Sequence, residues 1–190
     1  AMELALKDYV QRGGRALIVR AGDFFGPRAG NNWFSQGLVK PGQLPRIISY
    51  PGTIGVGHQW AWLPDVADTI AALLARRHEL EPFARFHMQG HWDSDGSEMS
   101  QAIQRVVARY GGRAVAKSFP WWLVKLAAPF NATLREMVEM HYLWRLPVRL
   151  RNDKLVDFLG AEPHTPLDSA VYQTLQGLGC LPAGAINSEA

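Results

Sequence analysis

Histidine and aspartate side chains gather in one short stretch of the sequence and are the first candidates for chemistry. His87 and His91 flank a turn, and Asp93 and Asp95 follow closely. A zinc site needs ligands that converge on one point, with nitrogen and sulfur preferred. We expect His87 at the end of a strand and His91 in a loop, so the two rings need not converge. We interpret these residues as the polar rim of a loop and predict no metal site.

The glycine-rich stretch GTIGVG, at residues 52–57, has the composition of a phosphate-binding loop. Its spacing is G-x-x-G-x-G, the reverse of the dinucleotide-binding fingerprint. A strand-like segment, residues 58–62, follows it, whereas a phosphate site needs the N-terminus of a helix. We therefore interpret the stretch as a turn between two strands. The sequence also has no P-loop pattern and no G-x-S-x-G nucleophile elbow.

Cysteine and arginine give weaker signals. Cys180 is the only cysteine and has no basic residue beside it, which favours an inert thiol. A single cysteine excludes an internal disulfide framework and fits a reduced, cytoplasmic setting. The basic stretch RLPVRLR, at residues 145–151, is interpreted as a solvated face.

Composition indicates a soluble globular chain. Of 190 residues, 47% are hydrophobic and 19% are charged, which supplies a real core and excludes general disorder. A net charge of +3 without a long basic run gives no indication of nucleic-acid binding. The longest apolar candidate, residues 121–130, contains Lys125 and Pro129 and is too short to span a membrane. No signal-peptide pattern stands at the N-terminus.

The order of the predicted elements indicates an α/β fold. Residues 2–11 form a helical pattern that ends at two glycines, and residues 16–20 form a buried strand, so together they make half of a βαβ unit. Residues 22–32 have the composition of a turn-rich loop. Further strands are predicted at 46–50, 58–62, 83–88 and 114–118, and helices at 33–39, 65–77, 101–110, 152–159 and 167–175, with a mainly helical region at 121–146 broken by Pro129.

Aromatic residues cluster on the segments that follow the first strand. They are Phe24, Phe25, Trp33, Phe34, Trp60 and Trp62. Ligands of α/β proteins bind at the carboxyl ends of parallel strands, and the first three of these residues fall on such a loop. Both a binding pocket and a plain hydrophobic core explain this set.

Four segments, in their order along the chain, resemble a known family. They are VRAGDFFGP at 19–27, NNWF at 31–34, WLPDVA at 62–67 and LGAEP at 159–163. This order resembles the C-terminal half of an extended or atypical short-chain dehydrogenase/reductase of the NAD-dependent epimerase/dehydratase family. The resemblance covers nearly the whole chain.

The resemblance implies a partial Rossmann-like chain with a small, mostly helical substrate-binding lobe. Residues 1–190 would be a single C-terminal portion of that fold. Residues 1–77 and 83–90 would supply the residual Rossmann elements with their substrate loops, and residues 91–190 the mainly helical lobe. The N-terminal nucleotide-binding half, with its glycine-rich loop and the Tyr-x-x-x-Lys pair, would lie before residue 1.

The resemblance also implies site residues. The predicted cofactor-side residues are Ala21, Gly22, Asp23 and Phe24, and the predicted substrate-side residues are Phe25, Asn31, Asn32, Trp33, Trp60 and Trp62. Asp23 could bond a ligand hydroxyl or brace the turn. No catalytic residue is expected within the chain.

The implied function is the substrate-binding half of an NAD(P)-dependent epimerase, dehydratase or reductase. The parent reaction would transfer a hydride at a secondary alcohol or ketone of a small-molecule substrate. We expect no tight binding of NAD or NADP by this chain alone, because it lacks the phosphate cradle. The alternatives are a non-catalytic small-molecule-binding or regulatory module, and a scaffold that completes its sheet by pairing with another chain as a homo-oligomer.

Overall fold

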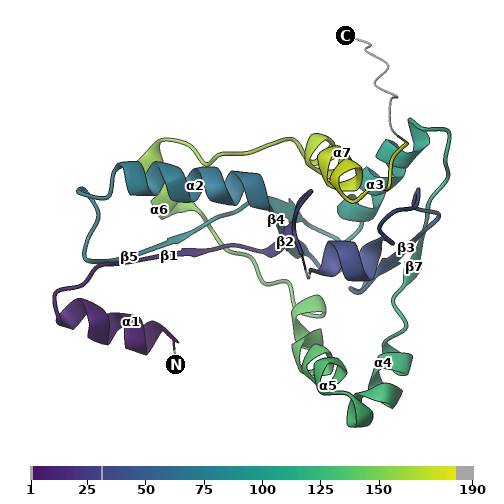
Figure 1. Cartoon of the computed structure of the whole chain (residues 1–190), viewed down its shortest axis with the longest axis horizontal. Helices are drawn as coiled ribbons and strands as arrows, with labels where there is room; N and C mark the ends of the chain where they lie inside the picture. Colours follow the sequence, from purple (N-terminus) through teal and green to yellow (C-terminus); the bar gives the residue numbers. More distant parts are fainter. Residues whose placement is uncertain (1, 31, 183–190) are drawn as a thin grey trace.

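The computed structural model describes residues 2–30 and 32–182. A layered part of the molecule is built on two parallel strands, β1 (Ala16–Arg20) and β5 (Phe83–His87), paired from Ala16–Phe83 to Arg20–His87. One face of this pair carries α1 (Met2–Gln11), and the other carries α2 (Leu63–Ala75) and α6 (Asp153–Leu159) (Figure 1). The helical crossover between parallel strands is the connection that such strands require.

A second sheet, in the order β2-β4-β6, lies at the carboxyl end of β1. Its central strand β4 (His58–Trp62) is buried throughout and runs parallel to β2 (Asp23–Phe25) and antiparallel to β6 (His91–Asp93). Two predictions were therefore wrong: residues 23–25 are not loop, and His91 begins a strand instead of lying on a loop rim. A strand of three residues is too short to show an alternating pattern in the sequence. β2 and β6 are strands because they pair with β4.

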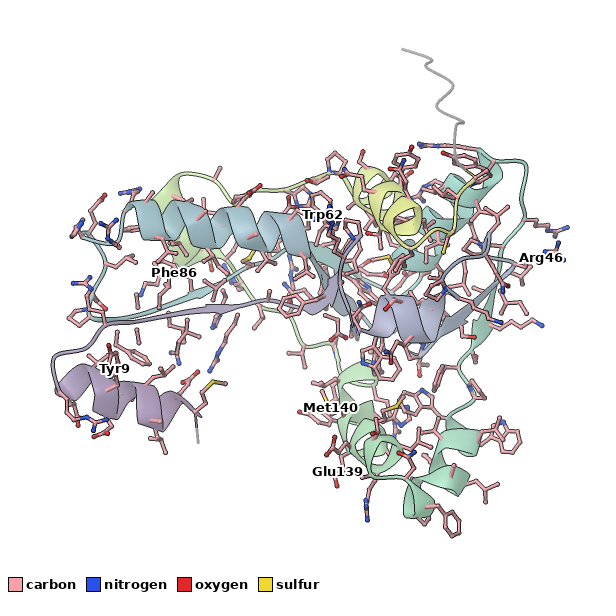
Figure 2. The ribbon with its side chains drawn as sticks, viewed as in Figure 1. Tyr9, Arg46, Trp62, Phe86, Glu139 and Met140 are labelled. Carbon is pink, nitrogen blue, oxygen red and sulfur yellow. The ribbon has the colours of Figure 1, made fainter. Side chains whose placement is uncertain are left out.

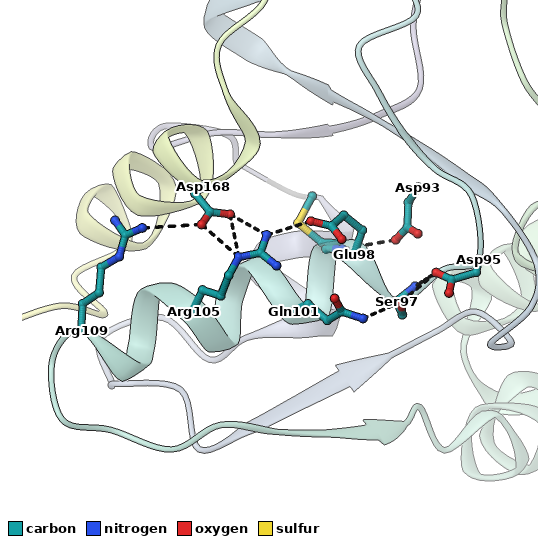
Figure 3. Close-up of polar contacts among 9 residues, drawn as sticks. Asp93, Asp95, Ser97, Glu98, Gln101, Arg105, Arg109 and Asp168 are labelled. Atoms are coloured by element: carbon teal, nitrogen blue, oxygen red, sulfur yellow. Dashed lines mark hydrogen bonds and ion pairs between the residues drawn. The ribbon is translucent and has the colours of Figure 1, made fainter.

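A third pair of parallel strands, β3 (Ile47–Tyr50) and β7 (Val115–Ser118), lies beside the packed helices α3 (Glu98–Ala108) and α7 (Leu167–Gly177). Arg105 of α3 joins these helices, because its guanidinium donates to Asp168 of α7 at 2.7 Å, and it also donates to Glu98 of its own helix at 2.8 Å (Figure 3). The hydrogen bond from Arg105 lowers the pKa of Asp168.

A helical lobe projects away from the sheets (Figure 1). It contains α4 (Trp121–Ala127), the 3-10 turn Ala128–Phe130, α5 (Ala132–Glu139) and the 3-10 turn Met140–Trp144. The predicted break at Pro129 is confirmed, since α4 ends at Ala127 and Pro129 lies in the 3-10 turn that follows. Asn131 then caps α5 by accepting a hydrogen bond from the Leu134 N–H at 3.2 Å. Figure 2 shows Glu139 and Met140 on this lobe.

Two hydrophobic cores hold the described residues together. The larger, which we call the aromatic core, includes Phe25, Phe34, Trp60 and Trp144 and extends under α3 and α7. The smaller, which we call the layered core, contains Ala61, Val66, Leu73, Ala84, Phe86, Met88 and Leu155. Figure 2 marks Trp62 in the first and Phe86 in the second.

The other predicted elements have counterparts in the structure. The helix predicted at 33–39 is a short π-type turn at Phe34–Leu38, and residues 51–57 form a turn between β3 and β4 as predicted. No helix within the described residues is both long and apolar enough to cross a membrane. The division at residues 77, 83 and 91 stays a prediction.

Candidate functional site

A cavity of about 450 Å³ lies where β1 ends and β2 begins. All four residues predicted on the cofactor side, Ala21 to Phe24, line it. The other lining residues are Val19, Arg20, His58, Gln59, Leu143, Val148 and Leu150. This is the place where an α/β sheet opens a crevice for ligands, the carboxyl end of a parallel strand. We call it the β1-end cavity.

Gly22 and Gln59 fix the backbone around this cavity. A Cβ at Gly22 would lie 2.2 Å from the carbonyl oxygen of Gln59, so only glycine fits. The Gln59 side chain accepts from the Leu150 N–H at 2.7 Å and donates to the Gln89 carbonyl at 2.5 Å. It also lies within 3.2 Å of the carbonyls of Met88 and Leu150. The chain leaving the helical lobe is thereby held against β4.

Asp23 and His58 form a hydrogen-bonded pair on the cavity wall. His58 Nε2 lies 2.8 Å from Asp23 Oδ2, and the imidazole stacks on the Trp144 indole with centroids 3.8 Å apart. A carboxylate only accepts hydrogen bonds, so His58 Nε2 is the donor to Asp23. The sequence placed Asp23 at the site but did not reveal His58, which is 35 residues away. Through this hydrogen bond, Asp23 of β2 contacts the first residue of the neighbouring strand β4.

A second cavity, of about 400 Å³, lies between residues 32–37 and the helical lobe. It is lined by two predicted substrate-side residues, Asn32 and Trp33, and by Gln36, Gly37, Phe119, Thr133, Glu136, Met137 and Met140. We call it the lobe cavity. Trp33 packs edge-on to Trp144 at 5.4 Å, so one aromatic cluster connects the two cavities. The Asn32 amide is used locally, donating to the Ala29 carbonyl at 2.9 Å.

The remaining predicted substrate-side residues are placed differently. Phe25 and Trp60 are fully buried and Trp62 is 7% exposed, so all three pack in the aromatic core and line neither cavity. Phe25, Trp60 and Trp62 therefore belong to the core, whereas Phe24 and Trp33 line cavities, and their role in ligand binding stays a prediction. Asn31 lies outside the described residues.

Cys180 and the glycine-rich turn are structural in character. The thiol is buried, and burial raises its pKa. Gly55 in the turn takes a φ of +94° and donates its N–H to the Asp95 carbonyl at 2.8 Å. The stretch connects β3 to β4, as the spacing predicted.

Comparisons with known proteins bear on the fold. No protein-family model matches the chain, and no curated protein matches significantly. Among solved structures, RMD from Pseudomonas aeruginosa complexed with NADPH is 16% identical, with a TM-score of 0.57 over 93% of this chain and 52% of that one. UDP-glucose 4-epimerase from Thermus thermophilus in complex with NAD is 19% identical, with a TM-score of 0.58 over 93% and 50%. The Bifidobacterium longum enzyme of the same name, with NAD+ and UDP, is 12% identical, with a TM-score of 0.55 over 92% and 51%.

The chain spans about half the length of each of these structures. It has a partial Rossmann-like α/β fold, of the type seen in these structures, among them epimerases, that hold NAD or NADPH. The fold that the sequence resemblance implied is thereby confirmed.

Proposed function

We propose that this chain is the substrate-binding half of an NAD(P)-dependent epimerase, dehydratase or reductase. The observation that supports this most directly is the β1-end cavity, lined by Ala21 to Phe24 in a fold shared with NAD and NADPH complexes. A volume of about 450 Å³ is within the range of small-molecule sites.

The residues of the cavity suit a flat, weakly polar ring such as a nicotinamide. Phe24 is 45% exposed and offers an aromatic face, while Gly22 lets a ligand approach the backbone closely. The cofactor, when bound, supplies the hydride chemistry. The Asp23–His58 pair would hold a proton at His58 Nε2 and orient the ring beside the reacting groups.

The substrate would extend from this cavity toward the lobe cavity. Trp33 and the lobe residues Met137 and Met140 give that second space a mainly apolar wall, with Glu136 as its carboxylate. Such a wall with few polar groups fits an organic substrate that carries a secondary alcohol or ketone.

The residues that bind the cofactor's pyrophosphate would be residues other than these 190. The sequence has neither the G-x-G-x-x-G fingerprint nor a Tyr-x-x-x-Lys pair. Binding of NADPH to this chain should therefore be weak and no stronger than binding of reduced nicotinamide mononucleotide, which lacks the adenosine end.

Saturation-transfer NMR with both nucleotides tests the proposal. We expect both to bind in the millimolar range, and we expect Phe24→Ala to weaken both severalfold. Phe130→Ala is the matched control, since Phe130 is 91% exposed on the helical lobe. Micromolar binding of NADPH would contradict the proposal that this chain lacks a pyrophosphate-binding site. Binding that Phe24→Ala leaves unchanged, or no binding of either nucleotide, would contradict the nicotinamide site.

The open edge of β1 favours a second proposal, a scaffold that completes its sheet with a second copy of the chain. Within residues 2–30 and 32–182, β1 pairs with β5 alone. Met2 and Leu4 of the neighbouring α1 are 77% and 71% exposed. An uncovered strand edge with adjacent apolar side chains is a surface for pairing. Light scattering should find a dimer, and a monomer across all accessible concentrations would contradict it.

A further inference from the structure

Three ligand-type side chains from distant parts of the sequence meet beside β4. Asp65 lies in the first turn of α2, His91 is the first residue of β6, and His164 lies between α6 and α7. One ligand atom of each lies within 4.8 Å of those of the other two. The two imidazole rings have centroids 4.6 Å apart.

His91 carries a polar atom that the fold does not satisfy. Its Nε2 is buried and has no hydrogen-bond partner among the described residues, while the side chain is only 8% exposed. A buried polar atom without a partner is costly and calls for an explanation such as a bound ion. His164 is exposed, so an ion can reach the cluster from solvent.

Neighbouring hydrogen bonds hold the cluster in place without using its nitrogen atoms. The Thr165 N–H and hydroxyl donate to the two carboxylate oxygens of Asp65, each at 2.8 Å. Glu162 accepts from the N–H of Gln89 at 2.9 Å and of Gly90 at 2.7 Å. The segment that carries His164 is thus fastened to both other ligand positions. Partners of this kind orient metal ligands in known sites.

Gly90 sets the path of the chain into His91. It takes a φ of +53°, and a Cβ there would lie 2.4 Å from the Trp60 carbonyl oxygen. Only glycine fits this approach, which brings the start of β6 against β4. The His91 ring is then fixed between Phe25, at 5.9 Å, and His164.

We propose that Asp65, His91 and His164 bind a divalent transition-metal ion, with zinc as the ion of best fit. Two imidazole nitrogens and one carboxylate are a donor set that zinc accepts, and three protein ligands leave a fourth position for water or another ligand. Ligand atoms around a tetrahedral zinc ion lie ~3.4 Å apart. The exposed His164 side chain is the ligand that can move to reach this spacing. The ion would join the start of α2, the start of β6 and the α6–α7 connection, three segments that are distant in sequence.

Titration of the whole chain with Co²⁺ after removal of metals with EDTA tests this site. We expect one equivalent to produce the visible absorption of four-coordinate cobalt, zinc to displace it, and zinc to raise the unfolding temperature. His164→Ala should weaken binding by at least about tenfold. His78→Ala, a change at another exposed histidine, is the control and should bind as the unchanged chain does.

His91→Gln is the second variant, because it keeps a polar side chain of similar size at the buried position. We expect it to fold, as judged by circular dichroism, and to lose the cobalt spectrum. The proposal is overturned if the chain binds no cobalt or zinc, or if His164→Ala and His78→Ala bind equally well. It is also overturned if a folded His91→Gln protein keeps the spectrum.

Discussion

The aromatic core and the layered core differ in how completely they are enclosed. Nineteen buried residues form the first, and strands and helices surround them. Seven form the second, and they lie mainly on the side of β1 and β5 that α2 and α6 cover. The opposite face carries α1, in which no residue is buried. The aromatic core is therefore enclosed by its own strands and helices, whereas the layered part has one well-packed face and one face that α1 covers only thinly.

The largest effect should come from the aromatic core. Trp60 is fully buried and packs on Phe25 and Trp144, so Trp60→Ala should reduce the free energy of unfolding by about 3–5 kcal/mol. Trp122→Ala is the matched control, since Trp122 is 67% exposed and its removal should cost less than about 0.5 kcal/mol. Urea denaturation measures both changes in the free energy of unfolding, and equal losses would contradict the central role of Trp60 in the aromatic core.

Leu73 tests the layered core. It is fully buried in α2, and Leu73→Ala should cost about 2–4 kcal/mol, whereas Leu74→Ala, at a position 48% exposed, should cost little. Hydrogen exchange sharpens the test, because Leu73→Ala should speed exchange in β1 and β5 more than in β4. Uniform acceleration over all three strands would show that the two cores unfold together.

The ion pairs of Arg105 predict a pH dependence within the aromatic-core region. The pKa of Asp168 is lowered from 3.8 by its hydrogen bond with Arg105, so this stabilisation is present above pH ~4. It is lost as pH falls further and Asp168 gains a proton. Arg105→Met should cost about 1 kcal/mol at pH 7 and progressively less as pH falls below ~4 and Asp168 is protonated. Arg12→Met, in an exposed pair, is the control, and a cost for Arg105→Met that does not change with pH would contradict the assignment.

The smallest effect is expected on α1. Leu4 is 71% exposed, so Leu4→Ser should change the free energy of unfolding of the monomer by less than about 0.5 kcal/mol. Chemical denaturation at low protein concentration measures this. A loss above about 1 kcal/mol would show that this face is covered in solution and would remove the difference between the two parts.

Local sequence patterns predicted most of the fold because they record which side chains each element buries. In α2, which overlaps the helix predicted at 65–77, the apolar residues Val66 and Leu73 are buried, but Ile70 and Leu74 are 37% and 48% exposed. The apolar pattern identified the helix correctly, but fewer of its apolar side chains are buried than the pattern suggests. The strand predicted at 83–88 is present as β5, in which Ala84 and Phe86 are buried, whereas β2 and β6 exist only through their pairing with β4.

The candidate sites were predictable only where their residues are neighbours in sequence. Ala21 to Phe24 share one loop and one short strand, so a local motif located the β1-end cavity. His58 meets Asp23, and Thr165 meets Asp65, only in the folded chain, 35 and 100 residues apart. In the sequence His91 lies close to His87 and to the aspartates that follow, but in the structure its ring lies against His164. No spacing rule connects residues whose approach depends on the packing of whole elements.

The hydrogen bonds of Gln59 make its carboxamide a substitute for a peptide group. Its oxygen and nitrogen face the N–H and carbonyl of Leu150, the arrangement that a neighbouring strand would offer. Asparagine would be one methylene too short for this mimicry, and glutamate would bring no N–H to donate. Position 59 thus extends hydrogen bonding from the face of the sheet through a side chain, to a stretch of chain that forms no strand of its own.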